Sequence, residues 1–250
     1  LLTLASAVWV RRTLRSDPDH PNDQPDDSMR RLLGYMLTIM GYTFFLNAIL
    51  RADLFILKSV SGGDAALLTG QSGAGAVLSN QLAGIYSAMQ NVARLPYQAV
   101  IAITFVAFPV VSRATFQGDR AATRLYIQQT ARYSLLLVGG MVSVLIADRN
   151  SLLSALYPTE YAPGANALFW LALAMMCFAL MYVGTTILIS AGRPVLAGCI
   201  AIITLLVTVS TALTWVTGEI ADWKLLERVA TATFIGTAVG LLCTGLSIKH

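Results

Sequence analysis

Polar side chains interrupt a long apolar stretch of the sequence, residues 78–113, in a pattern that suits the passage of a polar solute. Among them are Asn80, Ser87, Asn91, Arg94 and Gln98. From Ser87 onward they follow one another at steps of four, three and four residues, which places them on one face of an α-helix. The stretch is otherwise apolar and long enough to cross a bilayer, so this polar face predicts a transport path.

Arg94 is the residue of this face that needs the strongest explanation. It lies about 16 residues into the stretch, or about 24 Å at 1.5 Å per residue, which is near mid-membrane if the span begins near Leu78. A charge at that depth costs from about 3 to more than about 10 kcal/mol, and it is normally tolerated only beside a watery cavity or a partner. Pro96, two residues later, removes a backbone donor and is expected to bend the helix there.

The whole chain is too apolar for a soluble domain. Of its 250 residues, 56% are hydrophobic and only 12% are charged, and the mean hydropathy is +0.67. A soluble fold cannot bury that much apolar surface, so the composition predicts a polytopic membrane protein. The net charge of +4 reflects Arg beside membrane spans and does not indicate a nucleic-acid partner.

The three cysteines, Cys177, Cys199 and Cys243, each stand alone inside an apolar segment. Without a paired spacing they are expected to be small interior residues, and they predict neither a disulfide framework nor a metal site. No cofactor is expected.

The predicted fold is all-α, with a six-helix transmembrane bundle over residues 32–250. Residues 1–10 are apolar but too short to span, and we interpret them as the end of a truncated transmembrane helix. Residues 11–31, rich in Pro and Asp, are predicted to be a flexible linker, and residues 59–75, rich in Gly and Ser, an external loop. The spans are predicted at about 32–57, 78–113, 125–147, 165–190, 195–216 and 229–248.

Positive charge orients these spans. Ten of the seventeen Lys and Arg fall in loops and ends on one side of the predicted bundle, and four fall on the other side. By the positive-inside rule the richer side, which includes the 11–31 linker, is expected to be cytoplasmic.

The first span carries Asn47 and Arg51 one turn apart, with Asp53 two residues further on. Residues two apart on a helix do not face each other, so Arg51 and Asp53 are expected to pair elsewhere or to reach the outer interface. Arg51 lies about 28 Å along the helix at 1.5 Å per residue, where it either extends to the outer headgroups or lines a cavity.

Two further features lie inside predicted spans. Arg132 is near the inner end of the third span, one turn after Gln128, where contact with lipid phosphate is expected. Gly236 and Gly240 form a G-x-x-x-G pattern in the last span, which predicts a helix-packing surface rather than a chemical site.

Several short segments resemble the C-terminal lobe of oligosaccharide flippases, which belong to the multidrug/oligosaccharidyl-lipid/polysaccharide exporter superfamily. The matching segments follow the family's order over about residues 30–215. The sequence departs from the family at Gly139-Gly140, where many relatives have Pro in the third helix. The segments are LAGIYSA at 82–88, ARLP at 93–96, AFPVVSR at 107–113, RADLFIL at 51–57, LYPTEYA at 156–162 and AGR at 191–193.

The resemblance implies a two-lobed transporter in a bacterial or archaeal plasma (inner) membrane, of which this chain is the C-terminal lobe and lacks its N-terminal partner lobe. The implied cargo is an oligosaccharide on a polyprenyl diphosphate, moved to the outer leaflet for O-antigen, capsule or exopolysaccharide. Because guanidinium groups bind phosphate oxygens in pairs, Arg94 is the expected diphosphate contact.

Other residues receive roles from the same resemblance. Asn91, Ser87 and Gln98 are expected to bind sugar hydroxyls or cavity water. Arg51, with Asn47 beside it, would line the outer exit, and Arg132 would attract the headgroup at the inner entrance.

Two alternatives belong to other functional classes. A drug/cation antiporter of the same superfamily needs an intramembrane carboxylate for cation coupling, and Asp53 is the candidate, although its predicted place near the outer end favours the flippase. A membrane-embedded sugar polymerase or ligase needs reactive groups at the membrane face. The sequence shows short external loops, His only at His20 and His250, and no nucleophile–base pair, so an enzyme is not expected.

Overall fold

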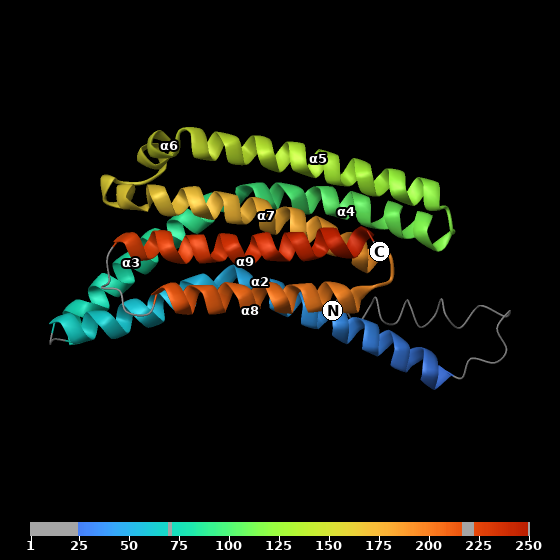
Figure 1. The fold of residues 1–250 in the computed structure, drawn as a ribbon, viewed down its shortest axis with the longest axis horizontal. Helices are drawn as coiled ribbons and strands as arrows, with labels where there is room; N and C mark the ends of the chain where they lie inside the picture. The colour runs from blue at the N-terminus through green and yellow to red at the C-terminus, as the bar shows by residue number, and fades with distance from the viewer. Residues whose placement is uncertain (1–24, 70–71, 217–222, 250) are drawn as a thin grey trace, which may run out of the picture. The chain divides into compact units, whose positions relative to one another are not determined.

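The structure is a computed structural model that describes residues 25–69, 72–216 and 223–249, and all of the elements in these ranges are helices. Figure 1 shows them in chain order. They are α2 (Pro25–Thr69), α3 (Ser72–Ala93), α4 (Leu95–Phe116), α5 (Arg120–Ala147), α6 (Arg149–Leu156), the 3-10 helix η1 (Thr159–Gly164), α7 (Ala165–Ser190), α8 (Pro194–Val216) and α9 (Trp223–Lys249). The predicted all-α fold is confirmed, whereas the truncated helix predicted at 1–10 lies outside the described residues.

Six segments are long and apolar enough to cross a membrane, which makes the chain a multi-pass membrane protein. They match the six predicted spans to within a few residues at most ends. The segments are Leu32–Ser61, Val77–Phe116, Ala121–Ala147, Thr159–Ser190, Pro194–Trp215 and Trp223–Ile248.

The chain divides into two compact units, residues 1–38 and residues 39–250. Of the first unit the structure describes the beginning of α2, which starts at Pro25, inside the stretch expected to be a linker. Proline is well tolerated as the first residue of a helix because its missing N–H has no helical acceptor there. Residues 11–24 of the expected linker lie outside the described residues.

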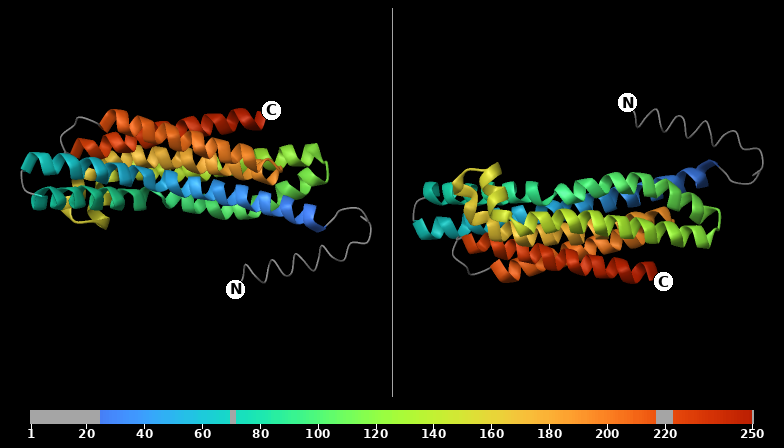
Figure 2. Two further views of the ribbon diagram at one scale, coloured as in Figure 1. Left: turned by 90° about the horizontal axis from the view of Figure 1, so that it is seen from below. Right: turned by 90° about the horizontal axis from the view of Figure 1, so that it is seen from above.

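Within residues 39–250, α7 is the central helix. It is apolar on all sides, and 18 of its 26 residues are buried, which is the pattern of a helix surrounded by others. It packs most extensively against α9 and also against α3, α4, α5 and α8. Figures 1 and 2 show α7 running among these helices, with α5 on one side and α9 on the other.

The seam between α8 and α9 explains the G-x-x-x-G pattern. A Cβ on Gly236 would overlap the side chain and backbone of Thr208, and a Cβ on Gly240 would overlap Thr204 and Met181. The two glycines therefore let the helices approach closely, so the predicted packing surface is confirmed.

The second span is divided, as Pro96 predicts. α3 ends at Ala93, α4 begins at Leu95, and Arg94 lies between them with φ −77° and ψ −13°. Pro96 has no N–H to donate to the preceding turn, so the regular hydrogen-bond ladder is interrupted at this point. The charged residue therefore sits at the break.

The prediction of an external loop at 59–75 is wrong for most of these residues. They are helical, because α2 continues to Thr69 and α3 begins at Ser72. Glycine weakens a helix by about 1 kcal/mol relative to alanine. Pairing between the two helices opposes that cost, and the hydroxyls of Ser61 and Ser79 lie 2.8 Å apart in a buried hydrogen bond.

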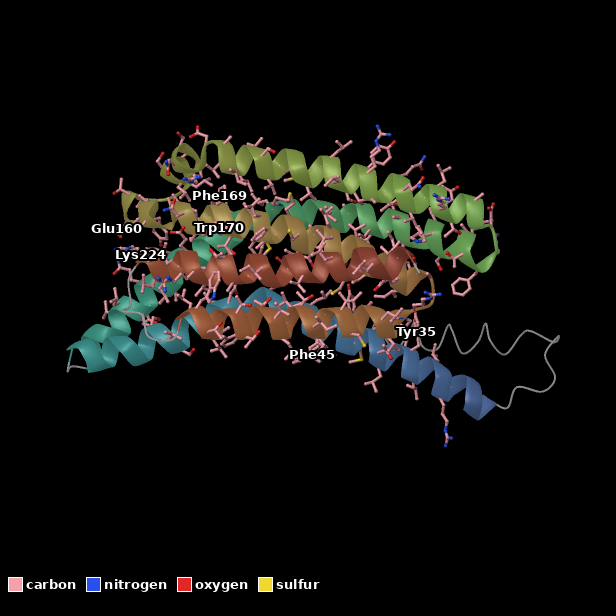
Figure 3. The ribbon with its side chains drawn as sticks, viewed as in Figure 1. Tyr35, Phe45, Glu160, Phe169, Trp170 and Lys224 are labelled. Carbon is pink, nitrogen blue, oxygen red and sulfur yellow. The ribbon has the colours of Figure 1, made fainter. Side chains whose placement is uncertain are left out.

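Aromatic side chains gather at the end of the bundle where α7 and α9 begin. Figure 3 places Phe169, Trp170, Glu160 and Lys224 at this end. The Arg149 guanidinium lies 5.6 Å from the centroid of the Phe169 ring, and the indole Nε1–H of Trp170 donates to Glu227 Oε1 at 3.4 Å. Such amphipathic aromatic groups are typical of the membrane–water interface, in agreement with a span end here.

Candidate functional site

Asp53 has a buried carboxyl group that accepts several hydrogen bonds. Its side chain is 1% exposed. Oδ2 accepts hydrogen bonds from the hydroxyl of Tyr86 at 3.0 Å and from Nε2 of Gln90 at 2.6 Å, and Oδ1 accepts from the backbone N–H of Leu54 at 2.8 Å. All three contacts use the carboxyl as an acceptor, which is the pattern of an ionised carboxylate.

Arg94 belongs to the same network through Gln90. Its Nη2 donates to Gln90 Oε1 at 3.1 Å and to the carbonyl of Leu50. Its Nε is buried and has no hydrogen-bond partner. Because the Gln90 amide lies between the carboxylate and the guanidinium, Asp53 and Arg94 interact through it rather than as a direct ion pair.

The local fold brings these groups together from two helices. Tyr86, Gln90 and Arg94 follow one another every four residues, so they form one row along α3 and its end. α2 runs antiparallel to α3, because Ser61 pairs with Ser79 whereas Leu50, eleven residues earlier, pairs with Arg94. This pairing sets Asp53 opposite the row.

The other predicted site residues of these helices lie on an exposed face. Asn47 and Arg51 are exposed on α2, Asn91 is exposed on α3, and Ser87 is half-buried. At about 100° per residue, Arg51 is turned about 160° from Asp53 around α2. Both helices also contact α7, α2 through the Tyr42–Thr185 hydrogen bond and α3 by packing. We call these four residues the polar face.

Arg94 lies half-buried at the inner edge of the polar face, held against α2. Its guanidinium contacts protein partners, the Leu50 carbonyl and the Gln90 amide, and its role in binding a ligand stays a prediction. Gln98 is exposed on α4, beyond the helix break.

Arg132 does not join the polar face. It is exposed on α5, a helix that packs against α4 and α7. The predicted headgroup contact at this residue is separate from the α2–α3 network and stays a prediction.

Sequence reasoning missed Tyr86 and Gln90 and did not foresee that Asp53 is buried between helices. The signal was present, because Gln90 lies four residues before Arg94 in a row next to the one through Ser87 and Asn91. The burial of Asp53 depends on which face of α2 meets α3, and a single helix pattern does not contain that information.

Aromatic groups fix the network to α7. The hydroxyl of Tyr42 on α2 lies 2.6 Å from Oγ1 of Thr185 on α7. Tyr97, one turn after Arg94, packs edge-on against Phe178 and Tyr182 with centroid distances of 5.1 and 5.5 Å. α2 and α4 are thereby both attached to the central helix, α4 one turn after Arg94 and α2 about three turns before Asp53.

The part of the chain that the structure describes holds no cluster that suits a metal ion. No three His, Cys, Asp or Glu side chains gather there as a metal site would require, and the cysteines are free thiols. A small cavity between α4, α5 and α7 has a mainly apolar lining, to which residues such as Phe108, Val111 and Ile187 contribute. It lies away from the polar face.

Comparison with protein-family models, with curated proteins and with solved structures finds no match for this chain. Function is therefore inferred from the residues and their geometry.

Proposed function

We propose that this chain is the C-terminal lobe of a flippase of the multidrug/oligosaccharidyl-lipid/polysaccharide exporter superfamily. In this proposal it works with an N-terminal lobe in a bacterial or archaeal plasma membrane. It moves polyprenyl-diphosphate-linked oligosaccharides from the cytoplasmic to the outer leaflet by alternating access.

The polar face of α2 and α3 is the observation that carries the proposal. Asn47, Arg51 and Asn91 are exposed although they lie within segments that qualify as membrane spans. Polar groups that face hydrocarbon lose their hydrogen bonds to water at a cost of several kcal/mol each. A water-filled groove, closed on its far side by a second lobe, removes that cost and gives a glycan a path.

The chemical groups of the polar face and of Arg94 match those of the proposed cargo. Amide groups both donate and accept hydrogen bonds, as sugar hydroxyls do, so Asn47, Asn91 and the hydroxyl of Ser87 match a glycan. Guanidinium groups match a diphosphate, and the Nε–H of Arg94 has no partner in the structure. In the proposal Arg51 serves the outer exit and Arg132 the inner entrance, and Gln98 continues the path.

The test is lipid-linked glycan flipping by the full-length protein in proteoliposomes. A fluorescent short-chain polyprenyl-diphosphate glycan is used, and its inner-leaflet fraction is followed by quenching from outside. Asn91→Leu is expected to slow flipping about fivefold, because one good hydrogen bond to a bound polar group is worth about 1 kcal/mol. Gln129→Leu on α5 is the matched control, since it removes an exposed amide that is not on the polar face.

If the Asn91→Leu and Gln129→Leu variants both flip the glycan at the wild-type rate, a glycan path along α2 and α3 is contradicted. Loss of flipping in both variants would instead indicate a general effect of removing amides from the spans.

A second candidate, a drug/cation antiporter, is favoured by one observation, the complete burial of Asp53 inside a span. Intramembrane carboxylates are typical of proton and cation relays. Asp53→Asn separates the candidates. The antiporter predicts that cation-driven drug efflux is abolished, whereas the flippase predicts glycan flipping without a cation requirement in the wild type and in the variant.

A further inference from the structure

The Asp53–Gln90–Arg94 chain has a direction that its chemistry imposes. Gln90 presents its NH₂ group to the carboxylate and its carbonyl oxygen to the guanidinium. An ionised carboxylate only accepts hydrogen bonds and a guanidinium only donates them. This amide orientation therefore satisfies both neighbours at once, and the opposite orientation satisfies neither.

The orientation depends on the charge of Asp53. A protonated carboxyl, or an Asn at position 53, has a donor as well as an acceptor, so it can bond to the amide in either orientation. With the amide turned, its NH₂ group would face the Arg94 guanidinium, and two donors repel each other. Arg94 would then lose the acceptor that holds it beside α2.

Gln90 is the hydrogen-bonded link between Asp53 and the charged group of Arg94. Among the described residues, the charged and titratable groups that face Asp53 are Tyr86 and Arg94. On α9 the neighbour is the neutral hydroxyl of Thr233, which lies beside Tyr86. Gln90 itself is 3% exposed, so water does not compete for its amide.

We propose that Gln90 is a positioning residue that transmits the charge of Asp53 to Arg94. When Asp53 is ionised, the amide holds the guanidinium docked against α2, with its Nε–H buried and unpaired. When that charge is lost, Asp53 no longer fixes the amide and no longer attracts the guanidinium, so Arg94 is held less tightly and can turn toward an anionic ligand. This inference rests on the proposed function, because the ligand it assigns to the released guanidinium is the diphosphate of the cargo.

The test measures the affinity of the purified full-length protein for farnesyl diphosphate by isothermal titration calorimetry in lipid nanodiscs. Asp53→Asn is expected to tighten binding about tenfold, because a diphosphate then gains a charge-assisted contact that the docked Arg94 does not offer. In a Gln90→Leu background the same Asp53→Asn change is expected to alter the Kd less than about twofold, since the relay is absent.

Two controls accompany these variants. Asp148→Asn removes a carboxylate that caps α6 through the Ser151 N–H, so it reports the general effect of one lost negative charge. Arg94→Ala reports whether diphosphate binds at Arg94 at all.

Unchanged or weaker binding in Asp53→Asn overturns the relay, and so does an equal effect of Asp53→Asn with and without Gln90. Should Asp53→Asn not fold, Gln90→Leu gives a second measurement. It removes the acceptor that holds the Arg94 guanidinium, so binding is expected to tighten about tenfold. Unchanged or weaker binding by Gln90→Leu overturns the proposal.

The failures of the two proposals are distinguishable. If Asp53→Asn binds farnesyl diphosphate no better than the Asp53→Asn, Arg94→Ala double variant, the proposed diphosphate contact is refuted together with the relay. If Arg94→Ala abolishes binding but Asp53→Asn has no effect, only the relay is refuted.

Discussion

Gly236 on α9 offers the sharpest test of how the bundle is held together. A Cβ at this position would lie 2.8 Å from Cβ of Thr208 and 2.9 Å from its Cα, which is a backbone atom. Relief therefore requires that α8 and α9 move apart, because a rotamer change of Thr208 cannot remove the contact with its Cα. Overpacking of this kind costs about 1–3 kcal/mol of unfolding free energy.

The chain supplies a matched control on the same helix. A Cβ added at Gly245 would meet no atom within 4 Å, so Gly245→Ala adds only helix propensity and is expected to stabilise by up to about 1 kcal/mol. At about 2–4 °C per kcal/mol for a chain of this size, Gly236→Ala should lower the Tm by about 2–12 °C and Gly245→Ala should raise it slightly.

Thermal unfolding in detergent, followed with a thiol-reactive dye, measures both variants in a background where Cys199 and Cys243 are replaced by Ser, because Cys199 is exposed in the folded protein. Cys177 is buried in α7 and becomes reactive when the helices separate. If Gly236→Ala is as stable as Gly245→Ala, the close α8–α9 contact does not contribute as the structure indicates, and the explanation of the G-x-x-x-G pattern is refuted.

The remaining predictions concern the polar network and the α2–α3 pair. Tyr86→Phe removes one of the three donors to Asp53, and it should cost about 1.5–3 kcal/mol of unfolding free energy in the same thermal assay; no change would mean that the carboxyl does not need the hydroxyl. Arg94→Ala should abolish most diphosphate-linked glycan flipping and Arg94→Lys should retain part of it, because Lys keeps the charge without the paired donors; wild-type flipping by the Ala variant would exclude a central role. Ser61→Ala and Ser79→Ala should each destabilise by about 1 kcal/mol and the double variant by less than their sum, since both remove the same hydrogen bond; strict additivity would show that the two hydroxyls are not paired.

Much of the fold could be predicted from the sequence because membrane spans are specified locally. Runs of about 20 apolar residues mark the spans, and Pro96 marks the break in the second one through its missing N–H. Gly236 and Gly240 predict close helix packing through their spacing alone. In each case the physical cause lies within a few residues of its effect.

The helical state of residues 62–69 and 72–75 could not be predicted in this way. Gly and Ser lower local helix propensity, and pairing between α2 and α3 outweighs it only when both helices are present. The candidate site shows the same limit. The stripe through Ser87 and Asn91 was visible in the sequence, whereas the carboxylate–amide–guanidinium chain depends on the register between two helices.

The interruption at Arg94 has a mechanical consequence. α3 packs against α7 and bonds to α2, whereas α4 packs against α5 and α7, so the two halves of one span belong to different groups of neighbours. Bending concentrates where a backbone hydrogen bond is already missing, and a residue at a pivot moves least while both arms swing. The guanidinium at this joint can therefore keep nearly constant depth in the bilayer while the ends of the span tilt around it.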